Sequence, residues 1–143
     1  MKRVLILDDE RSITFSLSRC LLSGTVQVIS CQDSLSAMRS LAETRIDAII
    51  ADVRLSVINP YEAIQFIHHV RSAHQEIPLI MMSGTEDLKA ETLKAGATYF
   101  FQKPLAVARL IQLLRVLGIE AGQEESHSKS TPNRYFGNAY GLS

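Results

Sequence analysis

The chain has 143 residues, which at roughly 150 residues per domain indicates one compact domain. Hydrophobic residues make up 46% and charged residues 21% of the chain, an ordinary balance for a globular protein that excludes disorder throughout. The 15 Lys and Arg residues equal the 15 Asp and Glu residues in number, so no net positive charge favours non-specific nucleic-acid binding.

Targeting and redox features are sparse. The longest apolar runs, such as 4–7 and 79–82, are too short to cross a bilayer, and the amino terminus lacks a signal-peptide pattern. Cys20 and Cys31 have no CxxC spacing, so we expect two buried, reduced thiols. These features predict a cytoplasmic protein with no membrane partner.

Five short segments, apolar or aromatic in character, are predicted strands: 2–7, 26–30, 46–51, 79–82 and 99–101. Five segments with helical spacing alternate with them, each marked by an apolar stripe or a stop signal. In chain order these are Ile13, Leu17 and Leu21 before Gly24; Leu35, Met38 and Leu41 after a cap at Asp33 or Ser34; Ile64, Ile67 and Val70; residues 86–95 before Gly96; and Val107, Leu110, Leu114 and Leu117 with Pro104 at the helix start.

This strict alternation predicts a doubly wound α/β fold over residues 1–119. Strands that are apolar on both faces suit a five-stranded parallel sheet between two layers of helices, a flavodoxin-like sandwich with strand order 2-1-3-4-5. Residues 120–143 contain no Val or Ile and are rich in Ser, Gly and Asn, so we expect a flexible tail or linker remnant. Tyr135, Phe136 and Tyr140 are unusual there and are candidates to dock on the domain or on a partner.

Polar residues follow four of the predicted strands. Asp8, Asp9 and Glu10 follow the first, Asp52 the third, Ser83 the fourth, and Lys103-Pro104 the fifth. Because the carboxyl ends of parallel strands lie at one edge of the sheet, these side chains are expected to converge.

The chemistry of that edge is readable from its residue types. Two carboxylates about 4 Å apart repel by about 4 kcal/mol at an effective dielectric of 20, so Asp8, Asp9 and Asp52 need a cation or a shared proton. Few oxygen ligands favour Mg²⁺, Lys103 supplies a positive charge, and Ser83 supplies a hydroxyl donor. Together these groups are typical of phosphoryl transfer in which a carboxylate can act as the nucleophile.

The same motifs resemble the receiver domain of two-component response regulators. The resemblance covers about residues 2–118 and rests on Asp8-Asp9 after LIL, Asp52 after IDAIIA, Ser83 after LIMM, and GATYFFQKPL with its Lys103-Pro104. Any one motif alone is weak, whereas all four in order are specific. The resemblance implies that Asp52 accepts a phosphoryl group from a histidine kinase or a histidine phosphotransfer protein.

The resemblance also implies roles for the surrounding residues. Asp9 is expected to bind Mg²⁺ directly, Asp8 largely through water, and Arg54 through its backbone carbonyl. Lys103 is expected to pair with the carboxylate and then with a phosphoryl oxygen.

Two further positions form the family's switch. Ser83 is expected to move toward the phosphoryl group, and Phe100 to turn inward as it does. By analogy the Lys103–Pro104 peptide bond is expected to be cis.

The expected function is therefore a signalling switch, with no enzymatic activity beyond self-catalysed phosphorylation of Asp52 and slow autodephosphorylation. Its output is predicted to be contact between the last two strand-helix units and a downstream protein, with homodimer formation on phosphorylation as one possibility and no direct nucleic-acid binding. Three alternatives stay open: a degenerate receiver that binds partners without phosphate, a fragment of a longer regulator, and an aspartyl-phosphate hydrolase of the haloacid dehalogenase type. Adjacent Asp8-Asp9 and the absence of a capping insert oppose the last.

The chain departs from the family pattern after the acceptor. Ser56 and Pro60 occupy positions where receivers commonly carry Pro and Gly, so we expect an altered loop in which Asn59 takes a left-handed conformation. Arg54 and Thr85 border the expected route of the hydrolytic water, and Arg54 either partly covers the phosphoryl group or points to solvent.

The histidines that stand near one another invite a metal hypothesis. His68, His69 and His74 lack the i, i+3 or i+4 spacing of a helical metal site, so solvated side chains are expected.

Overall fold

Strands and helices alternate along the chain as the sequence predicts. The structure is a computed structural model that describes residues 1–54, 61–104 and 106–122. Its strands are β1 (Lys2–Leu7), β2 (Val26–Cys31), β3 (Ala48–Asp52), β4 (Leu79–Ser83) and β5 (Tyr99–Gln102). Its helices are α1 (Arg11–Leu21), α2 (Ser34–Glu43), α3 (Glu62–Ala73), α4 (Lys89–Ala95) and α5 (Val107–Val116).

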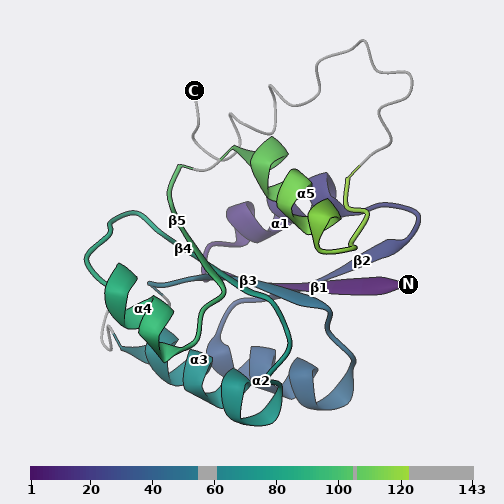
Figure 1. Ribbon diagram of the computed structural model, residues 1–143. Coiled ribbons are helices and arrows are strands. Elements are labelled where there is room, and N and C mark those ends of the chain that lie inside the picture. The colour runs from purple at the N-terminus through teal and green to yellow at the C-terminus, as the bar shows by residue number, and fades with distance from the viewer. Residues whose placement is uncertain (55–60, 105, 123–143) are drawn as a thin grey trace.

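The strands form one parallel sheet in the order β2-β1-β3-β4-β5, which confirms the predicted topology. Helices α1 and α5 cover one face, and α2, α3 and α4 cover the other (Figure 1). The register pairs Leu7 with Ala51 and Asp52 with Met82, so the carboxyl ends of β1, β3 and β4 lie at one edge. All polar residues that follow these strands are therefore brought to the same rim.

The central strands are buried on both faces. Ile6, Ile50 and Ile80 point toward α1 and α5, whereas their neighbours Leu5 and Ile49 point toward α2 and α3. Each of these side chains is at most 1% exposed. Since full burial of an aliphatic side chain contributes about 1.5–3 kcal/mol, this packing fixes the strand ends that carry the polar residues.

The second helix differs from its predicted stripe. Leu41 is buried as expected, but Leu35 is 64% exposed and Ala37 takes its place in the core. The helix begins at Ser34 because the Asp33 carboxylate accepts a hydrogen bond from the Ser36 amide at 2.8 Å. Leu35 thus lies in the first turn on the outer side, and its predicted place in the stripe is wrong.

The boundaries of two later helices also differ from prediction. Helix α4 begins at Lys89 rather than near residue 86, and it ends as predicted at Gly96, whose φ of 129° suits glycine. The prediction that Pro104 opens the fifth helix is wrong. Ala106 has an extended backbone, so α5 begins at Val107, and Pro104 precedes it in the predicted cis bond to Lys103.

The packed chain continues beyond residue 119. Ile119 is 2% exposed and Ala121 is fully buried. The Gly122 amide then donates to the Leu21 carbonyl at 2.9 Å, which holds this end of the described chain against α1. The predicted loop at Ser56, Asn59 and Pro60, and the predicted tail from residue 123 onward, lie outside the described residues.

Neither membrane nor disulfide features emerge in the described ranges. None of the helices described is both long and apolar enough to cross a bilayer. Cys20 and Cys31 are free and buried, as predicted. Burial raises the pKa of the Cys20 thiol to about 11, so this sulfur is protonated and unreactive at neutral pH.

Candidate functional site

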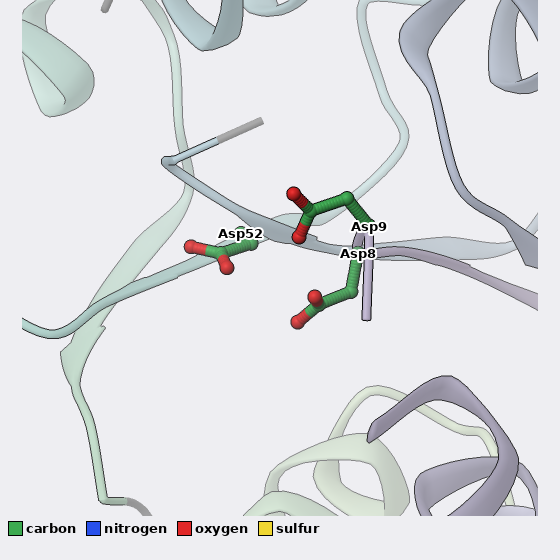
Figure 2. A group of neighbouring side chains, drawn as sticks. All are labelled: Asp8, Asp9 and Asp52. Atoms are coloured by element: carbon green, nitrogen blue, oxygen red, sulfur yellow. The ribbon is translucent and has the colours of Figure 1, made fainter. Parts of the chain in front are cut away.

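Three carboxylates converge where β1 and β3 end. One oxygen from each of Asp8, Asp9 and Asp52 lies within 4.8 Å of the others. Figure 2 shows the side chains of Asp8 and Asp9 extending from the end of β1 toward the side where Asp52 lies. The parallel register of β1 with β3 produces this convergence, because Leu7 and Ala51 are paired immediately before the acidic residues.

The three carboxylates have different surroundings. Asp8 is 2% exposed and Asp52 is 8% exposed, whereas Asp9 is exposed to solvent. The Glu10 amide donates to Asp8 Oδ1 at 3.0 Å, and the Arg54 amide donates to Asp52 Oδ1 at 3.0 Å. Two of the carboxylates are thus held by backbone donors inside the rim, and the third stands at its open side.

Lys103 supplies the cation at this rim. Its Nζ lies 3.2 Å from Asp52 Oδ2 and 3.4 Å from Asp8 Oδ2, so one ammonium bridges two strands. Burial alone lowers the pKa of Lys103, but the charges of Asp52 and Asp8 outweigh it and raise that pKa above its ordinary value. Lys103 is therefore charged throughout the neutral range.

Burial works against the charge on Asp8. It raises the pKa of Asp8, and the nearby Asp52 carboxylate adds to this rise. The Glu10 amide and Lys103 oppose it by stabilising the charged form. With all three carboxylates ionised, one lysine leaves two negative charges uncompensated.

This donor set fits a hard divalent cation. Carboxylate oxygens within 4.8 Å of one another repel by about 3–4 kcal/mol per pair at an effective dielectric of 20. A cation among them removes that cost, and a site with few protein oxygens and an open side suits Mg²⁺, which retains several waters. Asp8, Asp9 and Asp52 are the residues that would hold it.

Ser83 lies at the same rim, at the end of β4. Its side chain is 4% exposed, and its Oγ accepts a hydrogen bond from the Thr85 amide at 3.2 Å. The Ser83 carbonyl accepts from the Lys103 amide at 2.7 Å, so the predicted hydroxyl and the lysine are joined through their backbones.

Phe100 lies on β5 beside Met81 of β4. It is half-buried and packs against the core on the α2–α4 face, whereas its neighbours Tyr99 and Phe101 pack on the other face. Of the three aromatic residues of β5, the alternation therefore directs Phe100 alone toward the layer that contains α4.

The histidines do not join a site. His68 and His69 are exposed on α3, and His74 is the residue that ends this helix. Within the described parts of the chain, the three aspartates are the only group of His, Cys, Asp or Glu side chains close enough to bind a metal together. This agrees with the predicted solvated histidines.

Sequence reasoning missed the backbone donors that orient the acids. The amides of Glu10, Arg54 and Thr85 each reach back to a side chain two residues earlier. A polar residue that ends a strand and is followed by a turn is the signal that predicts such a bond.

A family model of the response regulator receiver domain matches residues 4–115. Among curated relatives, the transcriptional regulatory protein PrrA of Mycobacterium tuberculosis is 28% identical over 131 residues, covering 90% of this chain and 55% of the relative. The response regulator MprA of a Mycobacterium species is 27% identical over 117 residues, covering 80% of this chain and 50% of the relative. This chain thus spans about half the length of these relatives.

Solved structures agree with these matches. The chemotaxis response regulator CheY4 of Vibrio cholerae superimposes with a TM-score of 0.71 and 28% identity, covering 82% of this chain and 98% of that one. The beryllofluoride-activated NtrC4 receiver domain dimer gives a TM-score of 0.72 and 28% identity over 82% of this chain and 96% of that one.

Proposed function

Because the chain belongs to the response regulator receiver domain family, we propose that Asp52 accepts a phosphoryl group from a histidine kinase or a histidine phosphotransfer protein. The phosphorus–nitrogen bond of the donor phosphohistidine breaks, and a bond forms between phosphorus and a carboxylate oxygen of Asp52. The observation that carries this proposal is the grouping of Asp8, Asp9, Asp52 and Lys103 at one rim of the sheet.

Asp52 is suited to be the acceptor by its position between its neighbours. Lys103 contacts Asp52 Oδ2, and the Arg54 amide contacts Asp52 Oδ1, so the carboxylate is held before the donor arrives. Positioning of this kind lowers the entropic part of the barrier. After transfer the acyl phosphate carries nearly two negative charges, and Lys103 remains as the nearby protonated group.

The metal proposed for this rim is Mg²⁺, held by the aspartates and, as the family resemblance implies, by the Arg54 carbonyl. When bound, it supplies positive charge that offsets the negative charge on the phosphoryl oxygens. Asp9 is the most accessible of the three carboxylates, which supports its assignment as a direct ligand. Asp8 is already engaged by Lys103 and by the Glu10 amide, which supports its contact through water.

Phosphorylation is proposed to act through Ser83 and Phe100. Three new acceptor oxygens at Asp52 attract the Ser83 hydroxyl, which at present only accepts from the Thr85 amide. Phe100 is half-buried beside β4 and adjusts as Ser83 moves. The surface of the last two strand-helix units then changes, and a downstream protein or a second copy binds it.

The chain is thus proposed to be a phosphorylated switch rather than an enzyme with a separate substrate. The family match favours this reading over the hydrolase alternative. The matched relative PrrA, which is named a transcriptional regulatory protein, is about twice as long as the part that matches this chain, so direct nucleic-acid contact is not proposed for the receiver itself. The effect of the exposed Arg54 side chain on the lifetime of the acyl phosphate stays a prediction.

Intact mass spectrometry tests this function directly. The protein is incubated with Mg²⁺ and acetyl phosphate, and one added phosphoryl group is expected in the wild type and none in Asp52→Asn. Asp87→Asn is the matched control, because Asp87 is an exposed acid outside the rim, and it should be modified like the wild type. An adduct that persists in Asp52→Asn, or a wild type that forms none, contradicts the proposal.

A further inference from the structure

A groove runs along α1 at the β2 edge of the sheet, away from the α5 side of this helix. Its volume is about 910 Å³. Side chains of α1, the residue after it and β2 form most of its walls, among them Thr14, Phe15, Ser18, Leu22, Val28 and Ser30. The groove exists because β2 is the edge strand, so no further strand or helix of the described residues covers this side of α1.

Two large apolar side chains of this groove are open to solvent. Phe15 is 64% exposed and Leu22 is 48% exposed. A single exposed apolar residue is ordinary, but these two line the same concave surface and lie seven residues apart, which is two helical turns. Phe15 and Leu22 therefore give the groove an apolar surface suited to aromatic side chains.

The charged residues of the groove are mainly basic. Arg11 and Arg19 line it and are exposed, and Asp33 is its one acidic lining residue. The Arg19 guanidinium lies 5.8 Å from the centre of the Phe15 ring, so charge and aromatic surface are adjacent. An occupant that combines aromatic rings with carboxylates complements this surface.

The described chain ends beside this groove. The Gly122 amide donates to the Leu21 carbonyl at 2.9 Å, and the Ser23 hydroxyl donates to the Glu120 carbonyl at 2.8 Å. Leu22, between these two anchors, is a groove residue. Gly122, the last residue described, therefore lies at the carboxyl-terminal end of α1, next to the groove residue Leu22.

The sequence that follows contains acidic and aromatic side chains. Glu124 and Glu125 come two and three residues after Gly122, whereas Tyr135, Phe136 and Tyr140 come later, beyond Lys129 and Arg134. The acidic pair is thus the part of the segment that complements the basic groove. Thirteen residues lead from 123 to Tyr135, which can span at most about 45 Å extended and about 20 Å as a random coil. Helix α1, with 11 residues, is only about 16 Å long, so the aromatic residues can reach every part of the groove.

We propose that residues 123–143 dock in the α1–β2 groove of their own molecule. The rings of Tyr135, Phe136 and Tyr140 occupy the apolar surface at Phe15 and Leu22, and the acidic pair faces Arg19. The groove extends from Leu22 to Arg11 and does not include the aspartates of the acidic rim among its lining residues. Docking does not require phosphorylation of Asp52 and is distinct from the proposed phosphoryl transfer.

Nuclear Overhauser contacts in the isotope-labelled full chain test the proposal. We expect contacts between the three aromatic rings and the methyl groups of Leu22 and Val28. These contacts should be lost in Phe15→Ser and kept in Val116→Ser. Val116 is the matched control because it is an 82% exposed apolar residue of α5, away from the groove.

A second variant keeps the groove intact. The triple change Tyr135→Ser, Phe136→Ser and Tyr140→Ser should shift the amide resonances of Ser18 and Ser30 and leave those of α3 unchanged. Wild type without ring contacts, contacts that survive Phe15→Ser, or contacts that arise only between differently labelled molecules in a mixed sample would each overturn intramolecular docking.

Discussion

The two edges of the sheet differ in how well their charged side chains are compensated by neighbouring groups. At the carboxyl edge, three carboxylates lie together, Lys103 pairs with two of them, and burial opposes the charge on Asp8. At the amino edge, Arg71 directs five donor–acceptor contacts of 2.7–3.3 Å to oxygens before β4 and β5: the carbonyls of His74, Gln75, Ile77 and Gly96 and the hydroxyl of Thr98. At the amino edge the Arg71 guanidinium is thus hydrogen-bonded to five oxygens, whereas the carboxyl edge carries more negative than positive charge when its carboxylates are ionised.

The hydrogen-bonded amino edge thus lies opposite the edge at which the proposed switch is located. The contacts of Arg71 join the end of α3 to the α4–β5 connection, so the amino ends of β4 and β5 are tied together. The carboxyl ends of the same strands carry Ser83 and lead to Lys103, the residues proposed above to respond to a phosphoryl group.

Removing the Arg71 contacts at the amino edge should have the largest effect on the free energy of unfolding. Arg71→Met leaves several partly buried carbonyl groups without their donor, and we expect a loss of about 3 kcal/mol in the free energy of unfolding, measured by urea denaturation. Arg45→Met is the control, since the Arg45 side chain is 78% exposed and its ion pair with Asp47 is therefore open to solvent on one side, so its change should stay within about 0.5 kcal/mol. Equal losses of stability in Arg71→Met and Arg45→Met would contradict the stabilising role given to the Arg71 contacts.

Adding a divalent cation should stabilise the other edge. At a Mg²⁺ concentration ten times the Kd, the free energy of unfolding should rise by about 1.4 kcal/mol through mass action. Asp9→Asn should lose most of this rise, because it removes one carboxylate of the group. Asp87→Asn should keep it, and a similar rise in both variants would contradict the assignment of the metal site.

The carboxylate of Asp33 is a useful contrast at the carboxyl edge. The Ser36 amide lowers its pKa by donating to the charged form, so this acid stabilises the fold when ionised. Asp33→Ala should cost about 1 kcal/mol at neutral pH. The difference between the two proteins should be present above the ordinary carboxyl pKa and should shrink as pH falls below it; denaturation at pH 7 and at acid pH measures this.

Asp8 should show the opposite sign, with the smallest effect because Lys103 offsets part of the cost. Its pKa is raised in the folded protein, so the neutral form is favoured by folding, and that stability is lost as pH rises through the raised value. In Mg²⁺-free buffer, the free energy of unfolding of Asp8→Asn relative to wild type should therefore increase from acid to neutral pH. A relative stability that falls over this range would contradict the burial effect.

The fold and the membership of the site could be predicted from the sequence. Alternation of two hydrophobic periods defined the strands and helices, because each period reflects which sides of an element are buried. Parallel strands place their carboxyl ends at one edge, so Asp8, Asp52, Ser83 and Lys103 were expected together before any distance was known. Their residue types alone indicated cation-assisted phosphoryl transfer.

Only the tertiary structure decided how each residue is used. Asp8 and Asp9 are adjacent and chemically identical, yet one is buried against Lys103 and the other is exposed, because successive residues at a strand end point to different sides. The contacts of Arg71 with Gly96 and Thr98 likewise depend on residues that lie 25 and 27 positions away in the sequence. A local sequence pattern indicates which residues are buried. The exposure, charge state and hydrogen-bond partners of a particular side chain depend on the residues that the fold places next to it.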